Sequence, residues 1–191
     1  MSVAATLRQV KDILSPSAGL GDVEGDRFRA VLRQLAGAVS VIATGSSSSR
    51  AGLTATSVTS LAVDPPTVLV TVNRAASAYP TLIAEARFSI NLLTDRQQPI
   101  ADRFAGRGGI AGAERFAGAE WTTLETGAPV LVGALASIDC ELDEVIERHS
   151  HGILIGRVKA VAIDDTAGAL LYWRAGYERL GTLPSGTDPI G

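Results

Sequence analysis

The sequence predicts a mainly β protein with short helices, folded as an antiparallel barrel that is closed or partly closed. Apolar residues alternate with a period of two in several segments, and 20 Gly and 8 Pro provide the turns that many short strands need. Strand-like and helix-like segments do not alternate regularly, as they would in a doubly wound parallel sheet. We therefore expect about six strands and two or three short helices in one domain.

Composition excludes several classes of protein. Of the 191 residues, 46 % are hydrophobic and 19 % are charged, and the mean hydropathy is +0.23, which excludes a disordered chain. No apolar run approaches the ~18 residues of a membrane span or resembles an export signal, so we expect a soluble cytoplasmic protein. The net charge of −3 and the scattered Lys and Arg argue against nucleic-acid binding. The single cysteine excludes a disulfide framework.

Three parts are predicted along the chain. Residues 1–25 form an N-terminal arm with one amphipathic stretch, residues 26–183 form the domain, and residues 184–191 form a C-terminal tail. Asp26 is the expected N-cap of a first helix that ends at Gly37. The apolar positions of this helix recur at helical spacing, at Phe28, Val31, Leu32 and Leu35.

Strands are predicted where apolar residues alternate or form short runs: Val39–Ala43, Leu53–Leu61, Thr67–Val72, Phe88–Leu93, Leu135–Ile146 and Gly152–Ile163. The polar loop Gly45–Arg50 is interpreted as the turn of a hairpin, and Asp64-Pro65-Pro66 as a second turn. The last two segments are expected to be adjacent antiparallel strands. Short helices are expected at Ser77 or Tyr79 to Ala84 and from Asp95 to Phe104.

The segment Gly52–Ser60 is unusual because its last seven residues carry five hydroxyls where the flanking pattern predicts a strand. Hydroxyls and free backbone N–H groups together bind phosphate or the polar edge of an aromatic ring. A solvent-facing strand rich in Thr, which has good β propensity, would have the same composition. The residues alone leave both interpretations open.

A glycine pattern further along the chain matches the spacing G-x-G-x-x-G/A of a dinucleotide-binding turn, with Gly106, Gly108 and Ala111. That turn follows a buried strand, whereas the preceding Ile100–Phe104 is charged and typical of a helix. We interpret Gly106–Gly118 as a loop.

The two histidines, His149 and His151, would share a face of a strand or converge in a turn. Zinc would need a further ligand, and only Glu147 is near, so we predict no metal site. One histidine as a hydrogen-bond donor or pyrophosphate contact is one interpretation, and two solvated histidines are the other. Cys140 lies on an apolar strand face and is expected in the core.

No pattern of a nucleophile with its base is present, so hydrolase chemistry has no support. Aromatic residues late in the chain either stack on a planar ligand or anchor a core or a subunit interface: Trp121, Tyr172, Trp173 and Tyr177. The residues alone indicate a barrel-like domain with one candidate ligand edge.

Several segments, taken in order, resemble the flavin reductase-like family, whose fold is the FMN-binding split barrel. The resemblance covers about residues 28–180. It rests on Gly52–Leu61 with Asp64-Pro65-Pro66, on Phe88–Leu93 with Phe104-Ala105, on Trp121, on Ala134-Leu135 with Asp139-Cys140, on His151 before Ile155-Gly156, and on Leu170-Leu171-Tyr172 with Gly176-Tyr177.

The resemblance implies a homodimer in which each flavin lies close to the subunit interface. It implies that the edge of the isoalloxazine contacts main chain and hydroxyls at Thr54, Ala55, Thr56, Ser57, Val58 and Ser60. It implies that the phosphate-bearing tail is held by Val72, Asn73, Arg74 and Ser77, that Ser89 and Asn91 lie near the ring, and that His151 faces the nicotinamide. Family members commonly carry Gly-Asp-His where this sequence has His149-Ser150-His151, so His151 lacks one possible partner and His149 has no assigned role.

The function that the resemblance implies is hydride transfer from NADH or NADPH to FMN or FAD, with no side chain acting as acid or base. The reduced flavin would reach a separate flavin-dependent monooxygenase by diffusion. One alternative is a reductase that retains its flavin and reduces another acceptor, such as a corrinoid or a ferric chelate. Others are a flavin-binding protein without turnover and a plain β-barrel interaction module.

Overall fold

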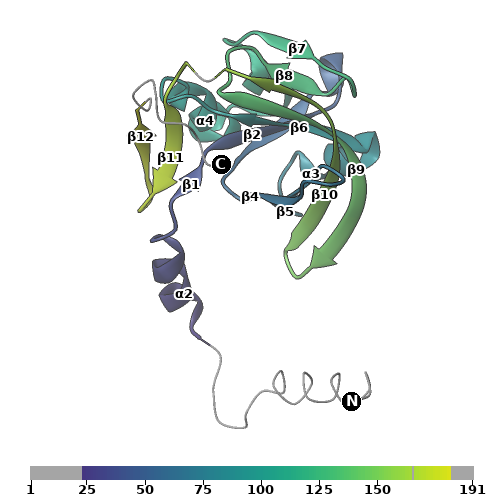
Figure 1. The fold of residues 1–191 in the computed structure, drawn as a ribbon. Helices are drawn as coiled ribbons and strands as arrows, with labels where there is room; N and C mark the ends of the chain where they lie inside the picture. Colours follow the sequence, from purple (N-terminus) through teal and green to yellow (C-terminus); the bar gives the residue numbers. More distant parts are fainter. Residues whose placement is uncertain (1–22, 165, 182–191) are drawn as a thin grey trace, which may run out of the picture. The chain divides into compact units, whose positions relative to one another are not determined.

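The structure is a computed structural model that describes residues 23–164 and 166–181 (Figure 1). The chain divides into two compact units, residues 1–34 and 35–191. The amphipathic stretch of the predicted arm and the predicted C-terminal tail lie outside the described residues. Within the part of the chain that is described, no helix is long and apolar enough to cross a membrane.

The first unit contributes helix α2, Gly25–Leu32. The helix is where the sequence predicts it, but its N-cap is Glu24 and not Asp26. Asp26 lies in the first turn, where its carboxylate pairs with Arg29 instead of capping the helix. The helix also ends earlier than predicted, at Leu32, and Arg33 caps it.

The second unit is built on one seven-stranded sheet in which every neighbouring pair is antiparallel. Its order is β3 (Ala51–Ala55), β2 (Ser40–Thr44), β6 (Arg87–Leu92), β9 (Ala136–Arg148), β10 (His151–Ile163), β5 (Thr67–Asn73) and β4 (Val58–Ala62). The predicted hairpin around Gly45–Arg50 and the predicted pairing of the two long strands are confirmed.

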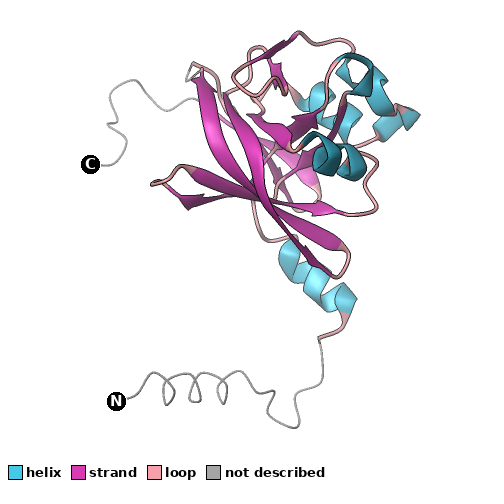
Figure 2. Ribbon diagram, turned by 90° about the vertical axis from the view of Figure 1, so that its right-hand side faces the viewer, coloured by secondary structure: helices cyan, strands magenta, loops and turns pink. Residues whose placement is uncertain are grey.

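The sheet closes round a common core. Strands from both ends of the order and helix α3 (Tyr79–Glu85) contribute to one buried cluster: Ile42, Ala55, Val68, Val70, Val72, Leu82, Phe88, Ile90, Cys140 and Leu154. In Figure 2 the strands cross one another steeply, as expected for a sheet that coils round its core. The predicted fold class, a mainly β antiparallel split barrel, is therefore confirmed.

A second layer covers the outside of β2 and β6. It consists of helix α4 (Gln98–Phe104), the sheet of β1 (Gly37–Ala38), β11 (Ala169–Trp173) and β12 (Gly176–Leu180), and the hairpin of β7 (Trp121–Thr123) and β8 (Pro129–Leu131). Their apolar side chains form a second cluster that includes Val41, Phe104, Phe116, Leu131 and Leu170. Because both faces of β2 are covered, all five of its residues are buried, and the predicted alternation there does not separate core from solvent.

Three further details differ from prediction. The described chain has twelve strands, because the six predicted runs omit the short outer strands and because Leu53–Leu61 is two strands separated at Thr56–Ser57. Helix α4 begins at Gln98 and not at Asp95, since the Asp95 N–H bonds to the carbonyl of Gly168 and Gln97 caps the Thr94 N–H. The loop Gly106–Gly118 contains two short 3₁₀ segments, Arg107–Gly109 and Gly112–Phe116. It follows a helix, which excludes a dinucleotide turn.

Candidate flavin site

The hydroxyl-rich segment lies at the open side of the barrel. Strands β3 and β4 are the two edges of the sheet, and within the described strands each pairs on one side only. They follow one another in the chain, joined by Thr56–Ser57. An edge strand leaves every second backbone N–H and C=O without a ladder partner. The segment Thr54–Ser60 therefore offers main-chain groups to a ligand.

Only some of its side chains face outward. The Thr54 hydroxyl donates to the Ala101 carbonyl at 2.6 Å, and the Ser57 hydroxyl donates to the Thr71 carbonyl at 2.7 Å. Ala55 is buried and Val58 packs against the barrel core. Thr56, Thr59 and Ser60 are exposed. The outward groups of this segment are therefore its main chain and the hydroxyls of Thr56, Thr59 and Ser60.

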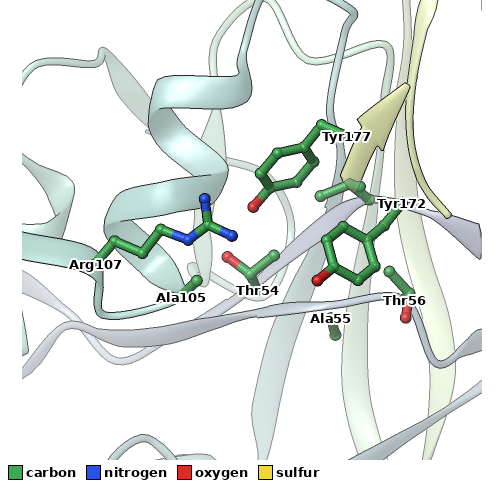
Figure 3. A pocket seen from close by; sticks show the side chains of 8 residues that line it. Thr54, Ala55, Thr56, Ala105, Arg107, Tyr172 and Tyr177 are labelled. Atoms are coloured by element: carbon green, nitrogen blue, oxygen red, sulfur yellow. The ribbon is translucent and has the colours of Figure 1, made fainter. Parts of the chain in front are cut away.

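A pocket of about 200 Å³ lies against the end of β3 (Figure 3). We call it the tyrosine pocket; its lining residues are Val39, Thr54, Ala55, Thr56, Ala105, Arg107, Tyr172 and Tyr177. The rings of the two tyrosines meet edge to face with centroids 5.4 Å apart. The guanidinium of Arg107 lies 5.4 Å from the centroid of the Tyr177 ring. Of the late aromatics, these two tyrosines thus offer stacking surfaces beside Thr54–Thr56, whereas Trp121 packs against Phe104 and Phe116.

Charged groups surround Tyr177. Arg107 pairs with Asp102 at 2.9 Å. Burial, followed by the negative charge of Asp102, raises the pKa of the Tyr177 phenol above its usual range, while Arg107 opposes this shift. Tyr177 is therefore a neutral hydrogen-bonding group at physiological pH.

A second pocket, of about 190 Å³, lies at the start of β3 and is polar. We call it the arginine pocket; its lining residues are Ser48, Ser49, Arg50, Ala51, Gly52, Ser77, Thr81, Gly112, Ala113 and Arg115. Two arginines and four residues with hydroxyls line this space, and no carboxylate is among the described residues that line it. Ser77, which is predicted to hold the flavin tail, is one of these residues.

The other residues predicted to hold the tail lie elsewhere. Val72 is fully buried in β5, and the Asn73 side chain accepts a hydrogen bond from the Ala75 N–H. Arg74 pairs with Glu147 at 3.1 Å and donates to the His149 carbonyl at 3.4 Å. Arg74 therefore braces the loop after β5 against the hairpin of β9 and β10.

That hairpin carries both histidines. His151 begins β10 opposite Asn73 and is exposed, and its Nδ1 lies 2.9 Å from the Ser150 hydroxyl. Ser150 thus stands where the family commonly has an acidic partner. His149 occupies the turn in a left-handed conformation with φ of 51°. No cluster of His, Cys, Asp and Glu suited to a metal occurs in residues 23–164 and 166–181.

Ser89 and Asn91 are fully buried in β6. The Asn91 side chain donates to the Val41 carbonyl and to Ser89, and it accepts from the Leu131 N–H and from Ser137. The Ser89 hydroxyl donates to the Pro129 carbonyl. The structure therefore buries these two side chains, whereas Thr56, Thr59 and Ser60 are exposed.

The sequence matches the flavin reductase-like domain family over residues 32–181. The chain belongs to this family. It is 43 % identical over 166 residues to FMN reductase (NADH) RutF 2 of Methylorubrum extorquens strain PA1, covering 87 % of this chain and 95 % of that protein.

Two solved flavin reductases share the fold. BorF, the flavin reductase component of a bacterial two-component tryptophan halogenase, superposes with a TM-score of 0.76 at 29 % identity, over 83 % of this chain and 99 % of BorF. The NADH:FAD oxidoreductase SgcE6 of Streptomyces globisporus C-1027 also gives a TM-score of 0.76, at 28 % identity, over 87 % of this chain and 99 % of SgcE6.

Within this flavin reductase-like domain, sequence reasoning missed the cations of both pockets. Arg50 follows the run of four serines, and a serine-rich run before an arginine is a signal that the prediction of a turn does not use. Arg107 and Arg115 lie in the glycine-rich loop, for which the sequence predicts no role. No local pattern marks them, because the fold brings them to β3 from more than fifty residues along the chain.

Proposed function

We propose that this protein is an NADH-dependent flavin reductase that takes FMN or FAD as its electron acceptor. The observation that carries the proposal is that one edge strand, β3, connects two different pockets. Thr54–Thr56 line the aromatic tyrosine pocket, and Ala51–Gly52 line the cationic arginine pocket. A flavin nucleotide has the same two ends, a planar ring and a phosphate.

The separation of the pockets suits such a ligand. A strand rises about 3.3 Å per residue, so the centres of the two contributing segments, Ala51–Gly52 and Thr54–Thr56, lie on the order of 10 Å apart along the chain. A ribityl chain spans that kind of distance between ring and phosphate. We propose that the ring lies against the main chain of Thr54–Ser60, with its edge toward the tyrosine pocket, and that the phosphate enters the arginine pocket.

The residues of the site would act by binding and orientation. When both are bound, NADH supplies a hydride and the flavin accepts it, a reaction for which the protein need not supply an acid or a base. The main chain of the edge strand would fix the ring, and Tyr172 and Tyr177 would exclude water from one side of it. His151 would donate a hydrogen bond to the nicotinamide amide.

We further propose that the reduced flavin leaves for a separate monooxygenase. Both pockets are open, which suits a flavin that exchanges rather than one that is retained. BorF, with a similar fold, is described as the reductase component of a two-component halogenase. The homodimer implied by the resemblance would place a second chain close to the exposed segment Thr56–Ser60.

The test is to mix the purified protein with NADH or NADPH and follow nicotinamide absorbance with no flavin, with FMN and with FAD. The proposal predicts oxidation only when flavin is added, and faster oxidation of NADH than of NADPH. Oxidation without added flavin, by a protein that is purified yellow, would favour a reductase with retained flavin and another acceptor. Bound flavin with no oxidation would leave a carrier or sensor.

A further inference from the structure

We propose that Glu147 and Ser150 are positioning residues that hold His151 in the orientation in which it meets the nicotinamide. The inference rests on the proposed function, in which His151 donates a hydrogen bond to the nicotinamide amide, and it names the residues that prepare this donor. His151 is exposed and lies at the first position of β10, directly after a two-residue turn. The orientation of its ring therefore depends on how that turn is held.

The turn His149-Ser150 has a strained backbone. Arg148 and His151 pair across the two strands, which leaves two residues for the turn. His149 has a φ of 51°, a left-handed conformation that suits Gly and is unfavourable for a residue with a Cβ. The family commonly carries Gly at this position and Asp at the next, and this chain has neither. A strained residue persists where surrounding contacts determine its conformation.

Arg74, in the loop after β5, supplies such contacts. Its backbone N–H donates to the Ser150 carbonyl at 2.9 Å, and its Nη1 donates to the His149 carbonyl at 3.4 Å. Both carbonyls of the turn are thus bonded to one residue of a neighbouring loop. The conformation of the turn therefore depends on where Arg74 points.

Glu147 determines the direction of Arg74. One oxygen of its carboxylate lies 3.1 Å from Nη2 of Arg74, and the other accepts a hydrogen bond from the Tyr79 hydroxyl at 3.2 Å. Tyr79 is only 8 % exposed and lies in the first turn of α3, so it fixes the carboxylate. An ion pair between half-exposed side chains adds little to stability. The role of Glu147 is therefore to orient Arg74, and through it the turn.

Ser150 orients the ring itself. Its hydroxyl oxygen lies 2.9 Å from Nδ1 of His151. A hydroxyl that donates to Nδ1 requires the ring proton to lie on Nε2, which is then a donor. An ionised Asp can only accept, so at this position it would draw the proton to Nδ1 instead. We infer that Ser150 donates to Nδ1 and leaves the Nε2–H of His151 for the amide oxygen of the nicotinamide.

The first experiment measures NADH oxidation by the full-length protein at saturating FMN. Glu147→Ala should raise the KM for NADH about fivefold and leave kcat within about twofold, because a hydrogen bond to the amide is the same before and during hydride transfer. Glu147→Gln, which keeps one oxygen acceptor, should recover part of the loss. Glu144→Ala, which removes another exposed carboxylate of β9, is the matched control and should change neither constant.

Double variants show whether Glu147 acts through His151. When His151→Asn is already present, Glu147→Ala should raise KM no further, since the group that it positions is gone. In a His149→Gly background the turn is relaxed, so Glu147→Ala should change KM less than about twofold. Additive losses in the first double variant would overturn the inference. So would a changed FMN affinity in Glu147→Ala, measured by quenching of flavin fluorescence, because it would show that Glu147 acts on the flavin.

Nuclear magnetic resonance of ¹⁵N-labelled histidine tests Ser150 without any substrate. In alkaline buffer, where free imidazole is neutral, we expect the proton of His151 on Nε2 in the wild type and on Nδ1 in Ser150→Asp. Ser150→Asp should also raise the KM for NADH about fivefold at unchanged FMN affinity. A proton on Nδ1 in the wild type, or an unchanged KM in Ser150→Asp, would overturn the inference. Failure of the proposed function is a different result, namely no NADH oxidation by the wild type with either FMN or FAD.

Discussion

The phenolic oxygen of Tyr79 donates a hydrogen bond to a carboxylate oxygen of Glu147 at 3.2 Å, joining the first turn of α3 to the end of β9. Burial and then Glu147 raise the pKa of Tyr79. The same ring fills the space beside Gly152, where an added Cβ would lie 2.5 Å from the phenolic oxygen. Tyr79 thus links helix α3 to the hairpin of β9 and β10, and this hairpin contains His151.

Gly152→Ala tests the contact between Tyr79 and the hairpin of β9 and β10. The added methyl group would press on Tyr79, so we expect the free energy of unfolding to fall by about 1–3 kcal/mol in urea titrations. Tyr79→Leu removes the obstructing ring, and in the double variant the two losses should sum to less than the separate values. Strictly additive losses would show that the ring moves aside freely. Gly181→Ala, with no atom of the described residues within 4 Å of the new Cβ, is the matched control.

His151→Asn should lower kcat/KM for NADH about tenfold and leave the affinity for FMN unchanged, since one hydrogen bond to the nicotinamide would be lost. The matched control is His149→Asn, because Asn tolerates the left-handed conformation at that position. Stopped-flow reduction of FMN at varied NADH gives the comparison. A larger effect at His149, or an equal effect at both, would contradict the assignment of His151 to the nicotinamide.

Cys140 makes the protein less stable in alkali. Burial, with a smaller contribution from Asp139, raises the pKa of this thiol from 9.0 to about 12. The unfolded chain therefore loses the proton before the folded chain does, and stability falls as pH rises through this interval by up to about 1.4 kcal/mol per pH unit. Cys140→Ala should flatten the decline in unfolding free energy between about pH 9 and pH 10, before tyrosines titrate. An unchanged slope would mean that the thiol ionises in the folded state.

Thr56→Trp should obstruct the site where the ring is proposed to lie. Thr56 is exposed and lines the tyrosine pocket, so the indole would occupy the ligand's space at little cost to the fold. We expect FMN and riboflavin to lose affinity together, by about tenfold or more. Thr122→Trp, at an exposed threonine of β7, is the control. Unaltered riboflavin binding in Thr56→Trp would place the ring elsewhere.

Asn91→Ala separates a supporting role from a ligand contact. Four hydrogen bonds of its amide join β2, β6, β8 and β9, so the substitution should lower the free energy of unfolding by about 2–4 kcal/mol. The FMN affinity of the folded protein should stay within about threefold of wild type. The reverse pattern, stable protein with weak FMN binding, would support the contact near the ring that the resemblance implies.

Local patterns predicted much of the barrel. The serine loop after β2 and the alternation on either side of His149-Ser150 each specify a hairpin through neighbouring residues, and both hairpins are present. Burial of Cys140 follows equally from its apolar strand face. The two helix starts were predicted wrongly for different reasons. Asp26 pairs with Arg29, three residues along the same helix, and the backbone N–H of Asp95 bonds to the Gly168 carbonyl, a partner that only the folded chain provides.

The two pockets could not be predicted from local patterns, because residues far apart in the sequence line each of them. Ser77, just before α3, and Arg115, in the glycine-rich loop, line one pocket at the start of β3, a relationship that no spacing in the sequence expresses. The tyrosine pocket likewise joins β3 to the late hairpin of β11 and β12. The resemblance indicated the hydroxyl segment and Ser77, but the local sequence did not show which cations would accompany them.

The link Thr56–Ser57 has a mechanical consequence. It ties together the only two strand edges of the described seven-stranded sheet, so the gap between them is held to within about 11 Å at that end, the reach of three consecutive Cα steps. A fully closed barrel would have to break ladder hydrogen bonds to admit a flat molecule. Here β3 and β4 do not pair with each other, so a flat ligand that binds at these two edges and leaves again would break no ladder hydrogen bond of the described sheet.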